Sequence, residues 1–377
     1  MFEDLSRHLH GLSERARLRA LAPRTGLDFT SNDYLGLTSH PGLRSAVAAA
    51  LERGVPLGSG GSRLLRGNHE EHELLEAEAA AQFGADTALF FSSGYAANAT
   101  LFATLPQKGD LVVRDALMHA SAREGMRLGR AQVVAAQHND ADAFADAISA
   151  WRKGGGAGRV WIAVESLYSM DGDAAPLGDL AALANGKDAV LVVDEAHATG
   201  VFGPEGRGLA TGLEGRENVI TMHTCGKALG CEGALVCGPA AVRNFLINRG
   251  AGFIFSTAPS PLMAAATRAA LRVLRTEPHL RERLRMLCAH ANGLLTKHVD
   301  APQTGSQIIP VVLGDDARAV AVARALQESG FDVRAIRPPT VPEGTARLRI
   351  SITLNVTAAD VDQLVAAMCD ALSGAVA

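Results

Sequence analysis

Short apolar runs recur along the first two thirds of the chain, and segments with helical periodicity lie between them. In chain order, the runs that resemble strands are TALFF, DLVV, AQVVAA, RVWIAVE, VLVV, VITM and GALVCGP. Apolar runs of roughly 4–8 residues are typical of strands buried on both faces of a sheet. Because these runs alternate with helices, they predict an α/β fold with a mostly parallel sheet and right-handed crossovers.

The pattern changes after about Ala264. A long helical segment with many arginines comes first, and strand-like patterns follow at 308–314, 332–338 and 346–354. Helices lie between and after these strands, a mixture that predicts a smaller α+β unit. We therefore predict three parts: an N-terminal arm over 1–45, a large domain over 46–263 and a small C-terminal domain over 264–377.

Composition narrows the class of protein. The 377 residues carry a net charge of −4 without long charged runs, which argues against nucleic acid or an acidic membrane as a partner. No apolar run approaches the roughly 20 residues that cross a bilayer, and MFEDLSRHLHGL lacks the apolar core of a secretory signal. Five cysteines without a C-x-x-C pair suit neither a disulfide framework nor a metal site. These features predict a soluble, cytoplasmic protein without a bound metal.

Reactive side chains follow two neighbouring strand patterns. One run ends on Asp194, with His197 shortly after it, and another is followed by Lys227. In open α/β sheets the ligand binds beyond the carboxyl ends of the strands. A carboxylate and a lysine there match the needs of pyridoxal phosphate (PLP), which takes an amine at its aldehyde and a carboxylate at its pyridine nitrogen.

The residues around Asp194 and Lys227 have two other interpretations. Residues 194–197 also spell DEAH, a box of nucleic-acid helicases, but such an enzyme needs the P-loop G-x-x-x-x-G-K-[ST]. The Gly-Lys pairs at 186–187 and 226–227 lack both the following Ser or Thr and the earlier glycine, which excludes that class. Most lysines are solvated surface residues. Lys227 differs because it stands between Cys225 and a small-residue segment, directly after a strand.

Two helix starts are further candidates. Gly94 and Tyr95 follow a strand and a Ser-Ser turn, and free amides at such a helix start favour a phosphate. A plain strand-to-helix connection explains this segment equally well. His119 also follows a strand and precedes a helix, although a lone histidine there is more often a cap or a core partner.

Motifs along nearly the whole chain resemble one enzyme family. They are SNDYLGL, GSGGSRLLRGNHEEHELLE, FFSSGYAAN, HAS, YSMDGDAAPL, VVDEAHATGVFGPEGRG, the Gly226-Lys227 segment, FSTAPSP and IRPPTVPEGTARLR. Together they are similar to the α-oxoamine synthases, which are fold-type I PLP-dependent transferases. The resemblance implies a seven-stranded, mostly parallel sheet flanked by helices in a large cofactor-binding domain, with a smaller C-terminal α+β domain.

The resemblance also implies roles for individual residues. Lys227 would bond to the aldehyde of PLP, Asp194 would face the pyridine nitrogen and His119 would stack on the ring. These three are the predicted catalytic residues. The remaining residues predicted to bind the cofactor are Gly94, Tyr95, Ser169, His197, Thr224, Ser256 and Thr257.

Substrates and assembly are implied in the same way. The motifs SMDGDAAPL and AIRPPTVPEGTARLR are closest to the members that condense L-alanine with pimeloyl-CoA or a pimeloyl-acyl carrier protein. Members that use glycine with acetyl-CoA, or that form 5-aminolevulinate, are the alternatives. The family forms homodimers with shared active sites, in which Ser256 and Thr257 reach the partner's cofactor. The residues predicted to contact substrate are Arg19, Asn32, Thr340, and Arg337 or Arg347.

Overall fold

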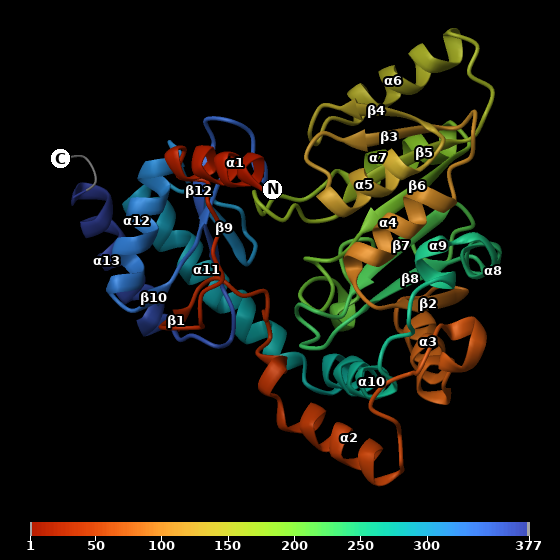
Figure 1. The fold of residues 1–377 in the computed structure, drawn as a ribbon, viewed down its shortest axis with the longest axis horizontal. Coiled ribbons are helices and arrows are strands. Elements are labelled where there is room, and N and C mark those ends of the chain that lie inside the picture. Colours follow the sequence, from red (N-terminus) through yellow and green to blue (C-terminus); the bar gives the residue numbers. More distant parts are fainter. Residues whose placement is uncertain (1, 375–377) are drawn as a thin grey trace. The chain divides into compact units, whose positions relative to one another are not determined.

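The computed structural model describes residues 2–374, and contacts divide this chain into two units (Figure 1). The first, here called the sheet unit, comprises Leu35–Tyr168 and Ala174–Arg281. The second, here called the terminal unit, contains the remaining described residues from both chain ends together with Ser169–Asp173.

A seven-stranded sheet forms the centre of the sheet unit, with strand order β2-β8-β7-β6-β5-β3-β4. Its strands are β2 (Thr87–Phe91), β3 (Leu111–Asp115), β4 (Gln132–Ala136), β5 (Val160–Glu165), β6 (Ala189–Asp194), β7 (Val219–Thr224) and β8 (Ala234–Gly238). The pairs from β4 through β7 are parallel, and β8 is antiparallel to both β7 and β2. The predicted α/β fold with a mostly parallel sheet is confirmed.

Helices cover both faces of this sheet (Figure 1). One face packs against α4 (Gly94–Thr104), α5 (Ala120–Leu128), α8 (Ala240–Arg249) and α9 (Ala251–Ile254). The other packs against α6 (Ala141–Lys153) and α7 (Leu177–Gly186). The sheet unit also contains the short helices η1 (Leu37–Ser39), η2 (Arg63–Gly67) and η3 (Pro204–Gly206), and the helices α2 (Pro41–Glu52), α3 (Glu70–Gln82) and α10 (Pro261–Thr276).

Side-chain alternation decides which face each strand residue meets. Val192 and Met222 belong to the core under α4 and α5, whereas Val193 belongs to the core under α6 and α7. Because successive side chains of a strand point to opposite faces, Asp194 and Thr224 project on the side of α4 and α5. The carboxyl ends of β6 and β7 therefore deliver two of the predicted site residues to one face.

The terminal unit has a three-stranded antiparallel sheet, β11-β12-β9, and a parallel pair, β1-β10. Its strands are β1 (Leu27–Asp28), β9 (Ile308–Gly314), β10 (Phe331–Asp332), β11 (Ala335–Ile336) and β12 (Ala346–Ser351). Its helices are α1 (Glu3–Glu14), α12 (Asp316–Glu328) and α13 (Ala358–Gly374), with most of α11 (Pro278–Val299). The predicted α+β character of this part agrees with these elements.

The unit borders differ from the borders predicted from sequence at 45/46 and 263/264. Residues up to 34 join the terminal unit because Leu27 pairs with Phe331, and α10 joins the sheet unit because it packs against α2 and α3. The helical segment after Ala264 is interrupted at Glu277, where α10 ends before Pro278 begins α11. The division into three domains stays a prediction.

Within residues 2–374, no helix combines the length and the apolar character that crossing a membrane requires.

Candidate active site

Asp194 ends β6 with its side chain buried and held on both oxygens. It is 4% exposed. Oδ1 accepts a hydrogen bond of 2.9 Å from the backbone N–H of Ala196, and Oδ2 accepts one of 2.7 Å from Nδ2 of Asn98 on α4. Because a donor engages each oxygen, the carboxyl group is held in one orientation on the α4 side of the sheet.

His119 is the N-cap of α5. Its Nδ1 accepts from the backbone N–H of Ser121 at 3.2 Å and lies 2.8 Å from Oγ of the same serine. His119 is an exposed residue, but partial desolvation by the atoms around its ring holds its pKa below the usual value. Lys227 and Arg123 lower this pKa further, and Asp194 opposes them. The imidazole therefore interacts electrostatically with both Asp194, at the end of β6, and Lys227, in the loop after β7.

Lys227 lies in a tight loop between β7 and β8. The loop is closed by backbone hydrogen bonds from Cys225 to Gly233, from Cys231 to Cys225 and from Gly230 to Lys227. The lysine side chain is half-buried. A loop fixed at both ends holds the amine beside the carboxyl end of the sheet.

The start of α4 lies against the end of β7. Ser93 caps the helix by accepting from the N–H of Ala96, and a Cβ at Gly94 would lie 3.4 Å from Oγ1 of Thr224. The first amides of a helix have no partner within it, so this end offers donors to an anion. Tyr95, also in the first turn, is 53% exposed.

The remaining residues predicted to bind the cofactor lie in three different places. His197 is buried in the turn after β6. Ser256 and Thr257 follow α9 in a loop joined to 57–61, because Ala258 donates to the carbonyl of Gly61. Ser169 belongs to the terminal unit, where its carbonyl accepts a hydrogen bond of 2.6 Å from Arg349.

The predicted substrate residues belong to the terminal unit. Arg19 donates to Oγ1 of Thr340 at 3.1 Å, so these two lie together. Arg337 donates to the carbonyl of Ala16, and Arg347 forms an ion pair with Asp171. Asn32 accepts 2.9 Å hydrogen bonds from Arg349 and from Tyr34. The roles of these residues, like those of the cofactor residues, stay predictions.

Three residues at these sites were not predicted from the sequence: Asn98, Ser121 and Arg349. Asn98 is 1% exposed on α4, a burial that only the structure shows, so no local sequence signal marks it. Ser121 is part of the HAS motif, but the hydroxyl was not singled out. Arg349 is one of two arginines in ARLR, which letters alone do not distinguish.

The cysteines behave as packing residues. Within residues 2–374 the five cysteines form no disulfide, and burial raises the pKa of the thiols of Cys225, Cys237 and Cys288. A thiol whose pKa is raised is a poor nucleophile, so these three side chains add no reactive group to the site.

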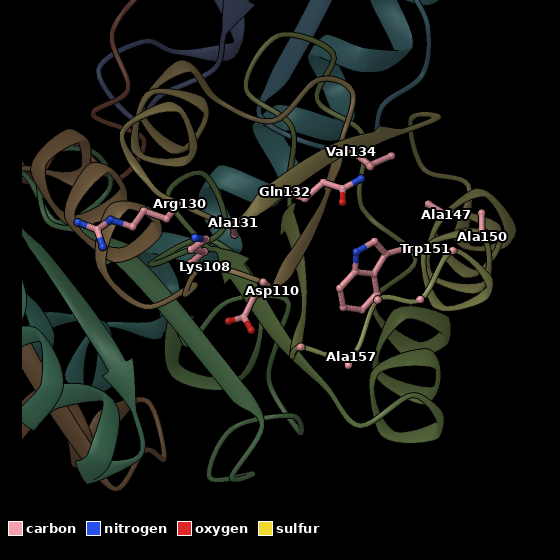
Figure 2. A pocket seen from close by; sticks show the side chains of 15 residues that line it. Lys108, Asp110, Arg130, Ala131, Gln132, Val134, Ala147, Ala150, Trp151 and Ala157 are labelled. Atoms are coloured by element: carbon pink, nitrogen blue, oxygen red, sulfur yellow. The ribbon is translucent and has the colours of Figure 1, made fainter.

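A separate cavity of about 1260 Å³ opens at the other end of the sheet (Figure 2). Figure 2 shows Gln132 and Val134 of β4 facing the Trp151 indole at the end of α6. Lys108, Asp110 and the glycine loop 154–158 also line it, near the amino ends of β3 and β5. Because Asp194, Thr224 and Lys227 lie at or after the carboxyl ends of β6 and β7, this cavity is distinct from the candidate active site.

Comparison with known proteins identifies the family. The model of the aminotransferase class I and II family matches residues 24–368. The chain is 46% identical to 8-amino-7-oxononanoate synthase of Anaeromyxobacter dehalogenans, over 93% of this chain and 87% of that protein. It is 42% identical to the Mycolicibacterium smegmatis protein of the same name, over 93% and 90%.

Solved structures of related enzymes support the same family. Serine palmitoyltransferase from S. paucimobilis with a bound PLP–myriocin aldimine matches with a TM-score of 0.90 at 27% identity, over 99% of this chain and 98% of that one. The 8-amino-7-oxononanoate synthase from Francisella tularensis matches with a TM-score of 0.78 at 28% identity, over 93% and 98%. The predicted fold-type I architecture is confirmed. The chain belongs to the aminotransferase class I and II family and, within it, to the 8-amino-7-oxononanoate synthases.

Proposed function

We propose that this protein catalyses the PLP-dependent, decarboxylative condensation of L-alanine with a pimeloyl thioester. The products are 8-amino-7-oxononanoate, carbon dioxide and the free thiol carrier, in a step of biotin biosynthesis. The relatives that share 41–46% of its residues over at least 90% of its length support this reaction most directly. The expected enzyme class and cofactor are confirmed by the family.

The residues of the site fit PLP. Each oxygen of Asp194 holds one hydrogen bond, which leaves lone pairs for a protonated pyridine nitrogen. The start of α4 and the hydroxyl of Thr224 offer donors to the phosphate, and the missing side chain of Gly94 leaves the Thr224 hydroxyl accessible. Lys227 supplies the primary amine that an aldehyde requires.

Asp194, His119 and Lys227 would have different roles in the reaction. When bound, PLP withdraws electrons from the substrate Cα and makes its proton acidic. Asp194 would hold a proton on the pyridine nitrogen, and His119 would stack on one face of the ring. Nζ of Lys227 removes the proton from Cα of alanine and later returns a proton to that carbon, after carbon dioxide has left.

Arg349 is our candidate for binding the alanine carboxylate. It is 8% exposed, and its partners in the described chain are neutral oxygens of Asn32, Tyr34, Ser169 and Ser351. A buried guanidinium without a carboxylate is costly, and a substrate carboxylate would provide the missing counter-charge. Arg347, a rival predicted from the sequence, already has Asp171 as its counter-charge.

The active form is a homodimer in this proposal. The joined loops around 57–61 and 255–260 carry two large exposed apolar side chains, Leu57 at 75% and Phe255 at 83% exposure, and Leu65 of the following η2 is 84% exposed. Large exposed apolar side chains on joined segments are typical of an interaction surface. Ser256 and Thr257 lie within it and would reach the partner's cofactor.

A substrate matrix tests the reaction. Purified protein is supplied with alanine or glycine and with pimeloyl-CoA, a pimeloyl-acyl carrier protein or acetyl-CoA, and thiol release and 8-amino-7-oxononanoate are measured. We expect turnover with alanine and a pimeloyl thioester. Preferred turnover of glycine with acetyl-CoA would replace this proposal with the glycine-using alternative, and a colourless, inactive protein would remove the cofactor assignment.

A further inference from the structure

We infer that Asn98 and Ser121 are positioning residues of this reaction. They join Asp194 to His119 by a chain of hydrogen bonds that fixes His119 as the neutral tautomer protonated on Nε2. The effect on the reaction rests on the proposed function, whereas the tautomer itself does not depend on it.

The orientation of the Asn98 amide follows from its partners. Asp194 Oδ2, 2.7 Å away, can only accept when ionised, so the group facing it is the NH2 of Asn98 and not the carbonyl. The same Nδ2 lies 3.0 Å from Oγ of Ser121. Because an amide nitrogen carries two protons, Asn98 donates one to each oxygen.

Within the described chain, the hydroxyl proton of Ser121 can be donated only to His119, because its other neighbour, Nδ2 of Asn98, is a donor. Its Oγ accepts from Asn98 and lies 2.8 Å from Nδ1 of His119, so the hydroxyl donates to that ring nitrogen. The backbone N–H of Ser121 donates to the same nitrogen at 3.2 Å. Two donors converge on Nδ1, which therefore carries no proton, and the imidazole is neutral with its proton on Nε2.

The environment of His119 favours the same form. The charged groups that face it are Asp194 at the end of β6, Lys227 in the loop after β7 and Arg123 on its own helix. Partial desolvation and the two cations lower its pKa, and the single carboxylate raises it. A neutral ring avoids placing a second cation beside the protonated pyridine nitrogen that Asp194 maintains.

The buried side chain of Asn98 also lowers the stability of the fold, and packing alone does not explain why an amide is present here. It is 1% exposed within the apolar core helix α4, and its Oδ1 has no hydrogen-bond partner in the described chain. An unsatisfied buried carbonyl destabilises a fold. An amide retained here at that cost is explained by the two bonds that its nitrogen makes.

The tautomer is tested directly on cofactor-free protein by 15N NMR of labelled histidines, with the His119 signals assigned through His119→Asn. Near neutral pH we expect an unprotonated Nδ1 and a protonated Nε2. Ser121→Ala and Asn98→Ala should both give a mixture of tautomers, and Ser121→Thr should restore the single form. A proton on Nδ1 of the wild-type residue, or variants that leave the tautomer unchanged, would overturn the inference.

Kinetics provide the second readout. Loss of one ordinary hydrogen bond corresponds to about tenfold in rate, so Ser121→Ala should lower kcat about tenfold, shift its pH profile and leave the KM for alanine unchanged. Asn292→Ala is the matched control, because Asn292 is also 1% exposed and bonded through Nδ2 but lies outside this chain of bonds. It should lower stability while the His119 tautomer and the kcat profile stay unchanged. An equal kcat shift in Asn292→Ala would reduce the role of Asn98 and Ser121 to general stability.

The two proposals fail separately. If the substrate matrix shows no condensation but the tautomer is as expected, the proposed function falls and the hydrogen-bond chain stands. If condensation occurs and His119 is protonated on Nδ1, the positioning role falls alone.

Discussion

Arg349 on β12 donates a 2.9 Å hydrogen bond to Oδ1 of Asn32, a residue from the opposite end of the chain. The bond joins an arginine and an asparagine within the terminal unit, and the guanidinium meets only neutral oxygens there in the described chain. This relationship separates Arg349 from Arg347, which is paired with Asp171, and from Arg337, which donates to a backbone carbonyl.

Arg349→Gln should raise the KM for alanine by about tenfold or more. A hydrogen bond to a charged group is worth about 1.5–3 kcal/mol, and the variant removes the positive charge that binds the carboxylate. Steady-state kinetics with alanine varied at saturating thioester measure this. The exposed Arg324→Gln is the control and should behave as wild type. A larger effect in Arg347→Gln or Arg337→Gln than in Arg349→Gln would contradict the assignment.

Phe255→Asp should convert the protein to monomers and abolish turnover. The side chain is 83% exposed next to Ser256, and a carboxylate there cannot be buried in an apolar interface without a large cost. Analytical ultracentrifugation gives the oligomeric state. Met286→Asp changes another exposed apolar residue, 59% exposed on α11, and should leave the assembly intact. A dimeric, active Phe255→Asp protein would place the interface elsewhere.

Gly230→Ala should destabilise the loop that carries Lys227. Gly230 has φ +64°, and a Cβ there would lie 2.5 Å from the backbone of Leu37 and Thr38. Strain and overpacking together cost about 2–4 kcal/mol. Gly54→Ala is the matched control, since Gly54 has φ +80° but open space around its Cα. Thermal unfolding should show the larger loss for Gly230→Ala, and equal losses would mean that the loop adapts without cost.

Glu195 should make stability depend on pH. Burial raises its pKa to about 7, against hydrogen bonds from Ala210, Ser166 and Leu209. Because the folded state then binds a proton that the unfolded state loses near pH 4.5, the contribution of Glu195 is complete below about pH 4.5. It declines as the pH rises to about 7, by roughly 3 kcal/mol in all.

Glu195→Gln isolates this contribution. The difference in unfolding free energy between wild type and Glu195→Gln should fall between about pH 4.5 and 7 and level off above that range. Urea unfolding across this range gives the difference directly. A constant difference, or one that grows with pH, would show that the carboxyl is ionised throughout the range.

The sheet was predictable because each parallel strand contains a short, mostly apolar run, which is a local signal. The order of the strands and the antiparallel direction of β8 were not, since they depend on pairing between distant segments such as Phe91 with Ala234. For the same reason, the pairing of Leu27 with Phe331 moved the N-terminal arm into the terminal unit.

In the candidate site, too, only the residues with a local sequence signal were predictable. Asp194 and Lys227 were identifiable because they follow strand patterns, and position after a strand is local information. Asn98 acquires its meaning from a carboxylate 96 residues away, and Arg349 from a partner near the N-terminus. Contacts of this kind between distant residues depend on the fold, and the sequence around each residue gives no signal of them.

The central claim is that Lys227 carries the cofactor, and covalent trapping tests it most directly. The purified protein is reduced with borohydride, digested, and its peptides are mapped by mass spectrometry. We expect the pyridoxyl phosphate group on the peptide containing Lys227, and no such group in Lys227→Ala, whose visible absorbance should also change. A modified Lys108 or Lys187 with an unmodified Lys227, or full turnover by Lys227→Ala, would contradict the account.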